Sequence, residues 1–114
     1  MKESLLEKIN YLLKNKKIQE AEFEMSKLGP EFYKNTDYLY LRGKIFFINK
    51  LYYIALDALL IATEFGEEEK VYDLIAKIYK VLGNKELSKK ISNTSSRLEA
   101  INSLKKEVTG ITQR

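Results

Sequence analysis

The side chains of this chain that could do chemistry are carboxylates, lysines and tyrosines, because its 114 residues include no histidine and no cysteine. The commonest general base, thiolate nucleophiles, disulfides and the usual zinc ligands are therefore missing. The remaining side chains form no paired carboxylates, phosphate-binding loop or nucleophile motif. We therefore expect a protein that is not an enzyme and that uses no cofactor.

Two local clusters have a chemical and a structural interpretation. The acidic run at residues 67–69 could hold a cation, but it also fits the negative first turn favoured at a helix start, and we prefer the second interpretation. We expect no metal site. Four tyrosines could stack on nucleic-acid bases, although aromatic residues at helical spacing are more often core or protein interface. These tyrosines are Tyr38, Tyr40, Tyr52 and Tyr53.

The positive charge of the chain is concentrated near its C-terminus. The net charge is +4, and residues 85–114 hold seven Lys and Arg against three Asp and Glu, whereas residues 1–84 hold 13 of each. A basic segment of this kind can bind nucleic acid or an acidic surface. We favour a solvated capping helix over a nucleic-acid site.

Helical patterns dominate, and the only proline is Pro30. Thr36 is the expected N-cap of the third of seven helices. The expected ranges are about 2–13, 18–28, 37–49, 52–65, 68–82, a short helix from 85, and about 97–107. A single helix from residue 85 to about 107 is the alternative for the last two.

The last expected helix has its own signals. Ser96 and Glu99 fit a capping box at its start. Leu98, Ile101 and Leu104 lie along one helical face and are expected to pack against the preceding helix pair.

The most informative pattern is a repeat with a spacing of 34 and then 33 residues. The aligned sets are Ile9, Gly43 and Ala76; Leu12, Phe46 and Tyr79; and Ala21, Ala55 and Ser88. A period of this length is typical of stacked helical hairpins, which bind partners. Gly43 falls inside a helical pattern, where glycine costs about 1 kcal/mol relative to alanine, so we predict that another helix packs closely there.

These residues resemble the tetratricopeptide repeat (TPR) family, whose unit is a 34-residue pair of antiparallel helices. In the middle repeat Gly43 and Phe46 stand in the Gly-x-x-Tyr slots of the family. The Tyr, Ala, aromatic and Ala slots of its second helix hold Tyr52, Ala55, Leu59 and Ala62. The first repeat fits through Leu5, Ile9, Leu12, Ile18, Ala21, Met25 and Leu28, and the third through Tyr72, Ala76, Tyr79, Gly83 and Ser88.

The sequence also departs from the family pattern. No tryptophan begins a repeat, and Lys8 and Arg42 occupy a slot that is usually leucine. The third repeat has Ser92 and Ser95 where the other repeats bury apolar residues such as Leu59. We therefore expect the third helix pair to be irregular.

The resemblance implies an all-α fold, a right-handed α–α superhelix of three TPR-like hairpins with a C-terminal capping helix. It implies one domain over residues 1–109. The expected parts are repeats at about 2–35, 36–69 and 70–95, a cap at about 97–108, and a frayed tail at 110–114.

In that family the first helix of each pair lines a concave groove that binds a partner. The groove candidates are Leu6, Asn10 and Leu13; Tyr40, Lys44 and Phe47; and Asp73, Lys77 and Lys80. Each trio has i, i+4, i+7 spacing and forms one stripe. Such a groove would suit an extended or helical peptide with apolar anchors and acidic residues. The carboxylate clamp of some family members is not expected, because leucines stand at most of its places.

The function that this reasoning predicts is a protein–protein interaction module, adaptor or chaperone-like, that binds a peptide or helix of another protein. The alternative is self-association, because the helices at 37–49 and 52–65 are too apolar for three hairpins to bury fully. Nucleic-acid binding is a less favoured third. No apolar run approaches the roughly 20 residues of a membrane span, and Glu3 and Glu7 interrupt any signal-peptide core, so we expect no membrane insertion and a cytoplasmic location.

Overall fold

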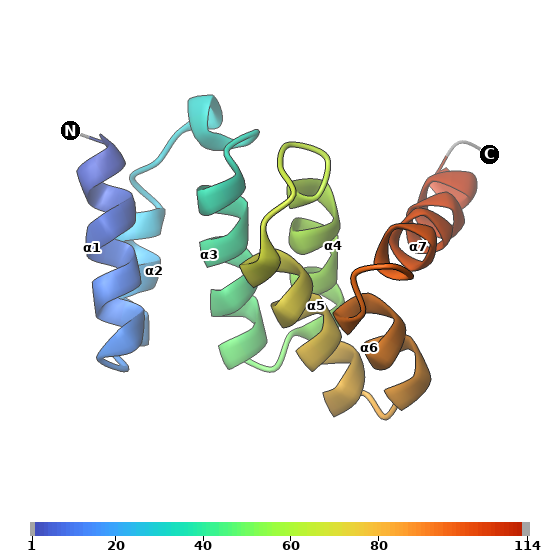
Figure 1. Cartoon of the computed structure of the whole chain (residues 1–114). Helices are drawn as coiled ribbons and strands as arrows, with labels where there is room; N and C mark the ends of the chain where they lie inside the picture. The colour runs from blue at the N-terminus through green and yellow to red at the C-terminus, as the bar shows by residue number, and fades with distance from the viewer. Residues whose placement is uncertain (1, 113–114) are drawn as a thin grey trace. The chain divides into compact units, whose positions relative to one another are not determined.

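The computed structural model describes residues 2–112, with side chains placed for residues 5–107 (Figure 1). Within this part of the chain all regular structure is helical, which confirms the all-α class. The helices are α1 (Lys2–Lys14), α2 (Ile18–Met25), the 3-10 turn η1 (Pro30–Phe32), α3 (Thr36–Ile48), α4 (Tyr52–Ala62), α5 (Glu69–Val81), α6 (Lys85–Ser92) and α7 (Arg97–Thr112). None of the helices in the described residues is long and apolar enough to cross a membrane.

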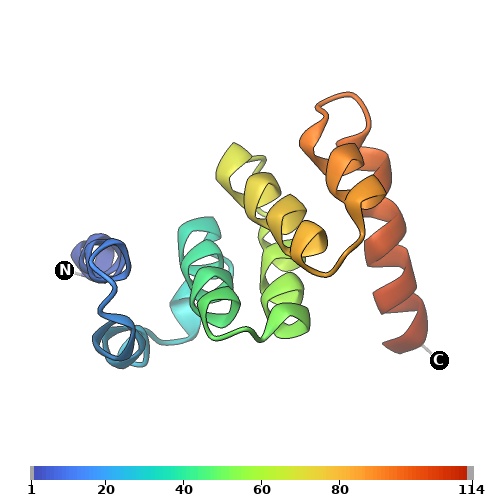
Figure 2. The ribbon, with the colours of Figure 1, turned by 90° about the horizontal axis from the view of Figure 1, so that it is seen from below.

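The chain forms two compact units, Met1–Glu67 and Glu68–Arg114, and each is described by itself. The first contains two helical hairpins, α1–α2 and α3–α4. The second contains the hairpin α5–α6, followed by α7. Figure 2 shows the two helices of each hairpin lying side by side and joined by a short turn. That these parts form one domain over residues 1–109 stays a prediction.

The three hairpin turns are built in the same way. The second residue after each first helix has a positive φ: 61° at Lys16, 63° at Lys50 and 90° at Gly83. The next amide donates back to the carbonyl of Leu12, Phe46 or Tyr79 at 2.9, 2.9 and 2.8 Å, respectively. This is the Schellman arrangement that ends a helix. The repeat spacing seen in the sequence is therefore also a spacing of backbone geometry.

We predict that Lys50→Gly stabilises the chain and that Gly83→Ala destabilises it. Both positions have left-handed backbone, which glycine adopts without the steric cost of a Cβ. Each change should alter the free energy of unfolding by about 0.5–1 kcal/mol, in opposite directions, or roughly 2–5 °C in melting temperature. Thermal unfolding followed by circular dichroism measures both. Equal melting temperatures for the parent and both variants would contradict the prediction.

In the first unit, Gly43 of α3 lies directly against α4. A Cβ built on Gly43 would lie 2.7 Å from Leu59 Cγ and 3.4 Å from the carbonyl oxygen of Ala55. Leu59 and Ala55 are fully buried. The prediction that Gly43 permits close helix packing is therefore confirmed. The same hairpin buries most of its apolar residues, namely Tyr38, Leu39, Leu41, Ile45, Leu56, Ala58, Leu60 and Ala62.

The first unit also buries a carboxylate. Glu24 of α2 is 7% exposed and lies between two lysines: Lys8 Nζ is 3.2 Å from Oε1 and Lys27 Nζ is 3.1 Å from Oε2. The hydrogen bonds from Lys27 and then Lys8 hold the pKa of this carboxyl below its usual 4.5. The Oε2 atom of Glu24 forms an ion pair with Lys27 but accepts no well-aligned hydrogen bond. Lys8 is therefore one partner of a buried acid.

Several sequence-based boundaries differ from the structure. The N-cap of α3 is Asn35, whose side chain accepts from the amide of Tyr38 at 3.0 Å, so the assignment of Thr36 as the cap is wrong. α2 ends at Met25 and α4 at Ala62, three residues before the predicted ends at 28 and 65. In each case the chain continues as a hydrogen-bonded turn of the same sense, so apolar residues in that turn extend the helical pattern without belonging to the helix.

In the second unit, α6 and α7 are separate helices, so the single helix from 85 to 107 is wrong. Asn93 Oδ1 accepts from the amide and hydroxyl of Ser95 at 2.9 and 2.7 Å, a local turn that competes with the helix. The hydroxyl of Ser96 donates to the carbonyl of Lys90 at 2.7 Å, a different use from the predicted capping box.

The buried face of α7 also differs from the predicted one. Ile101 is buried and Leu104 half-buried, as expected, but Leu98 is 52% exposed. The inner face is completed by Arg97 and Ala100 instead. α7 continues to Thr112, beyond residue 110, where we expected a frayed tail to begin; residues 113–114 lie outside the described part.

Candidate partner-binding site

The first trio of groove candidates lies mostly in the core of the first unit. Leu6 and Leu13 are 8% and 5% exposed, and Asn10 between them is half-buried. The i, i+4, i+7 spacing places the three on one face of α1 as predicted. Leu6 and Leu13 pack into the core, so they offer little surface to a partner.

The second trio forms a half-buried aromatic stripe on α3. The ammonium group of Lys44 lies 5.9 Å from the ring centre of Tyr40. The ring of Phe47 packs against Tyr52 of α4, with 5.8 Å between ring centres. Tyr40, Lys44 and Phe47 are therefore partly engaged within their own hairpin, and this face of α3–α4 is closed by bulky side chains.

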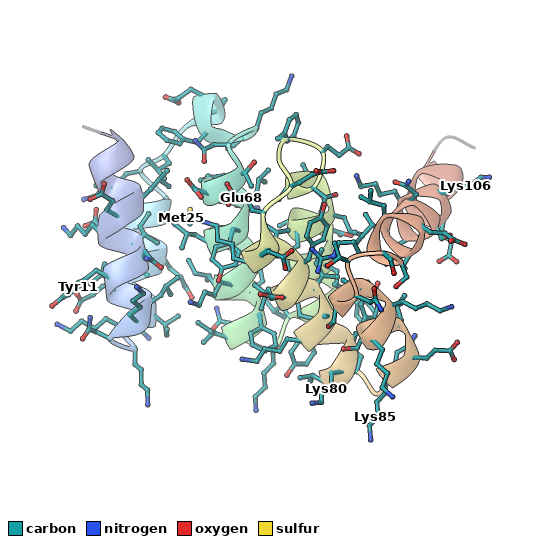
Figure 3. The ribbon with its side chains drawn as sticks, viewed as in Figure 1. Tyr11, Met25, Glu68, Lys80, Lys85 and Lys106 are labelled. Atoms are coloured by element: carbon teal, nitrogen blue, oxygen red, sulfur yellow. The ribbon has the colours of Figure 1, made fainter. Side chains whose placement is uncertain are left out.

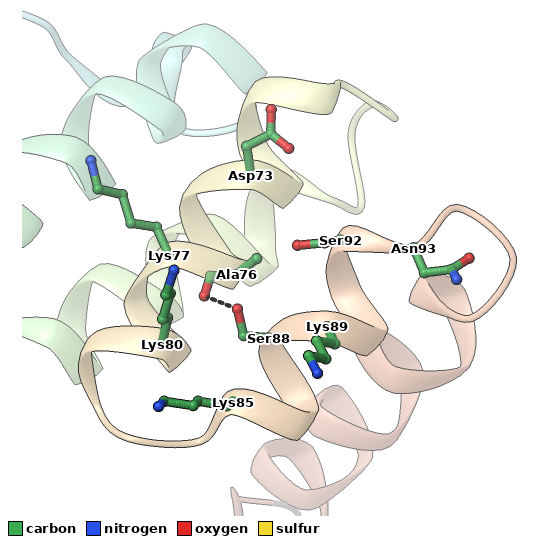
Figure 4. A pocket seen from close by; sticks show the side chains of 9 residues that line it. All are labelled: Asp73, Ala76, Lys77, Lys80, Lys85, Ser88, Lys89, Ser92 and Asn93. Carbon is green, nitrogen blue, oxygen red and sulfur yellow. Dashed lines mark hydrogen bonds between the residues drawn. The ribbon is translucent and has the colours of Figure 1, made fainter.

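The third trio is different, because Asp73, Lys77 and Lys80 are exposed and lie around a cavity of about 850 Å³ between α5 and α6. Figure 4 shows the side chains that line it, drawn from both helices. The residues on α5 are Asp73, Ala76, Lys77 and Lys80; Lys85, Ser88, Lys89 and Ser92 are on α6, and Asn93 follows. The structure thus gathers this predicted stripe with five residues from the next helix and its end.

The antiparallel register of α5 and α6 gives the cavity two unlike ends. Its middle is fixed by the hydroxyl of Ser88, which donates to the carbonyl of Ala76 at 2.7 Å. Lys80 and Lys85 lie at the turn between the helices (Figure 3). Asp73 and Ser92 lie at the opposite end, where the Ser92 hydroxyl points into the space between the helices (Figure 4). One end is therefore cationic and the other carries a carboxylate and hydroxyl groups.

The electrostatics of the cavity favour an acidic ligand. Four lysines and one aspartate line it, which gives a local charge of +3 from 4 minus 1. Ammonium groups along the wall of a concave surface concentrate their field where water is partly displaced. Sequence reasoning missed Lys85 and Lys89. Their i, i+4 spacing was a usable signal, but it was interpreted only as part of a basic segment.

Arg97 of α7 fixes the end of α6 that carries Ser92. Its guanidinium donates to the carbonyls of Ile91 and Ser92 at 3.1 and 3.2 Å. It also pairs with Glu69 of α5 at 2.5 Å and lies over the ring of Tyr72. The hydrogen bond that Arg97 donates to Glu69 raises the pKa of Arg97 and lowers the pKa of the Glu69 carboxyl. The sequence groups this arginine with the solvated basic C-terminal segment, but its side chain is only 6% exposed.

The acidic run at 67–69 behaves as a helix start. Glu68 is the N-cap residue of α5, and Glu69 lies in its first turn. Glu68 pairs with Lys70 at 3.4 Å, and Glu69 is held by Arg97. In the described residues no group of three or more acidic side chains is arranged to hold a metal ion.

Two of the four tyrosines that could stack on nucleic-acid bases pack against other aromatic rings of the protein instead. Tyr38 is buried, with its ring centre 5.9 Å from Tyr33 and 6.3 Å from Phe32. Tyr52 packs on Phe47.

A second cavity, of about 460 Å³, lies between α2 and α3 in the first unit, with Met25, Leu28, Ile45, Phe46 and Arg42 among its lining residues.

The sequence was also compared with known proteins. No protein-family model, no curated protein and no solved structure matched the chain.

Proposed function

We propose that the chain is a non-enzymatic interaction module that binds an acidic segment of another protein in the cavity between α5 and α6. The observation that carries the proposal is the gathering of the predicted Lys77 and Lys80 with Lys85 and Lys89 around one hollow of about 850 Å³. A peptide segment laid along this hollow would meet ammonium groups from two helices at once. We further propose that the three TPR-like hairpins form a right-handed superhelix with a C-terminal capping helix.

The chemistry of the lining supports binding rather than catalysis. Lysine, serine and asparagine side chains can donate hydrogen bonds to carboxylates and to peptide carbonyls. The single carboxylate, Asp73, stands at one end of the cavity and repels anions there. An acidic segment would therefore place its carboxylates towards Lys80 and Lys85.

The test uses a fluorescein-labelled peptide of six glutamates and the full chain, with binding followed by fluorescence anisotropy at low salt. We expect a high-micromolar dissociation constant that weakens as salt screens the lysines. The double variant Lys80→Gln/Lys85→Gln should weaken binding at least fivefold. Asp73→Asn should strengthen it, because it removes the one repulsive charge.

The matched control is Lys14→Gln/Lys17→Gln, which removes the same charge from exposed positions of the first unit. It should leave the affinity close to that of the parent. The proposal fails if the peptide does not bind at low salt, or if the control loses as much affinity as the cavity variant.

Self-association is a second candidate, because α4 presents large apolar side chains outward. Tyr53, Ile54 and Ile61 are 72%, 48% and 47% exposed. Exposed large apolar side chains that share a helix face, as Ile54 and Ile61 do at i, i+7 spacing, can form an interface. A second copy of the chain would cover it by pairing one α4 against another.

Sedimentation velocity over the micromolar range tests this candidate. We expect a dimer in the parent and a monomer in Ile54→Glu/Ile61→Glu. A parent that sediments as a monomer at several hundred micromolar would exclude this interface.

A further inference from the structure

We infer that the segment bound between α5 and α6 carries a leucine-sized apolar side chain next to acidic residues. This inference rests on the proposed function and specifies the ligand of the same cavity. It follows from comparing two hairpins of the chain that share one turn geometry. The turn residues Lys50 and Gly83 set the register between them at 33 residues.

At that register the cavity occupies a place that side chains fill in the α3–α4 hairpin. Gly43 and Leu59, which touch across that hairpin, correspond to Ala76 and Ser92. Ala76 and Ser92 both line the cavity. Leu59 is fully buried, whereas Ser92 is exposed. The third hairpin therefore lacks an isobutyl group that the second hairpin inserts between its own helices.

The rim of the cavity, formed by Lys80, Lys85 and Lys89, also differs from the matching positions of the second hairpin. Phe47 and Tyr52, whose rings pack together over the second hairpin, correspond to Lys80 and Lys85. Leu56, which is buried, corresponds to the exposed Lys89. The second hairpin therefore has a closed apolar face, whereas the third, with the same turn geometry, has an open face with a cationic rim.

A leucine side chain of a partner could thus enter the cavity beside Ala76, less deeply than Leu59 enters beside Gly43, because Ala76 carries a Cβ that Gly43 lacks. The methyl group of Ala76 and the long alkyl stems of the lysines supply apolar contact. The ammonium ends of Lys80, Lys85 and Lys89 would then lie next to the residues on the turn side of that leucine, where carboxylates match them. The chemistry of the partner is an acidic peptide with one central aliphatic residue.

Three labelled heptapeptides test the inference with the full chain. All have three glutamates on each side, and the central residue is leucine, serine or lysine. We expect the leucine peptide to bind about tenfold more tightly than the serine peptide, as burial of one aliphatic side chain allows. The lysine peptide should bind most weakly, and nuclear magnetic resonance shifts on leucine-peptide binding should centre on Ala76 and Ser92.

The decisive variant is Ser92→Leu, which restores the leucine of the second hairpin and occupies the part of the cavity beside Ala76. It should remove the preference for the leucine peptide while the serine peptide still binds through the lysine rim. Ser92→Met, which copies Met25 of the first hairpin, gives a second filled version. Thr94→Leu adds the same leucine at an exposed position outside the cavity and should keep the preference.

The outcomes separate this inference from the proposed function. If the leucine and serine peptides bind equally, or if both filled variants keep the preference, the inference is wrong and acidic-peptide binding stands. If none of the glutamate peptides binds, the proposed function and the inference both fail.

Discussion

Gly43→Val should lower the free energy of unfolding by about 3 kcal/mol. The Cβ of any residue at position 43 would lie 2.7 and 2.8 Å from Leu59 Cγ and Cδ2. The Leu59 side chain is completely buried, so these atoms are not the mobile end of an exposed side chain, and the carbonyl oxygen of Ala55 lies 3.4 Å from the same Cβ. The branched valine adds two methyl groups to a contact that is already too short for one carbon.

Gly43→Ala separates the steric cost from helix propensity. Alanine in a helix interior gains about 1 kcal/mol over glycine, so an unobstructed site would become more stable. We expect a net loss of about 1 kcal/mol, since overpacking commonly costs about 1–3 kcal/mol. Chemical denaturation of the parent and the variant measures the difference.

The double variant Gly43→Ala/Leu59→Ala locates the clash. Leu59→Ala alone should cost about 2–5 kcal/mol through its cavity. Because the second change removes the atoms that the first one meets, the double variant should be more stable than the sum of the single losses predicts. Simple additivity, or a stabilised Gly43→Ala, would contradict the close contact.

Arg97→Met should destabilise the second unit by about 2–4 kcal/mol. Methionine keeps much of the apolar stem but leaves the carbonyls of Ile91 and Ser92 without the donors that now reach them at 3.1 and 3.2 Å. It also removes the pair with Glu69 and the contact over Tyr72. Thermal unfolding and amide hydrogen exchange at α6 and α7 measure the loss. Lys106→Met, an exposed change on α7, is the matched control and should have little effect.

The dependence of stability on pH gives a second measurement of the Arg97–Glu69 pair. Arg97 lowers the pKa of Glu69 below its usual 4.5, so the stabilisation is present above about pH 4.5 and is lost as the pH falls through the lowered pKa. The parent chain should therefore lose stability on acidification below that point more steeply than Arg97→Met does. Equal acid sensitivity in the two proteins would show that the pair does not contribute.

Arg97 also connects stability with the proposed binding site. Ser92 belongs both to the cavity and, through its carbonyl, to the arginine's hydrogen bonds. Loss of Arg97 should free the end of α6 and weaken the binding of the leucine heptapeptide, even where the lysine rim is intact.

The sequence by itself determined the helices and their repetition. Apolar spacing, one proline and the polar turns located seven helices with ends mostly within three residues of those observed. The 34- and 33-residue spacing predicted three hairpins, and the same spacing appears in their turns. Gly43 was also interpretable, because a glycine in a strong helix pattern needs a packing reason. These properties are local, so neighbouring residues are enough to indicate them.

Other properties were decided only by tertiary structure. Helical spacing places Leu6 and Leu13 on one face of α1, but only packing directs that face into the core. The sequence shows Arg97 as one more positive charge, whereas its burial depends on carbonyls and on Glu69, 28 residues away. The cavity likewise requires α5 and α6 to be in register before four lysines and Ser92 surround one space. Local spacing fixes which side chains share a helix face; contacts between helices decide which faces are buried and which surround a cavity.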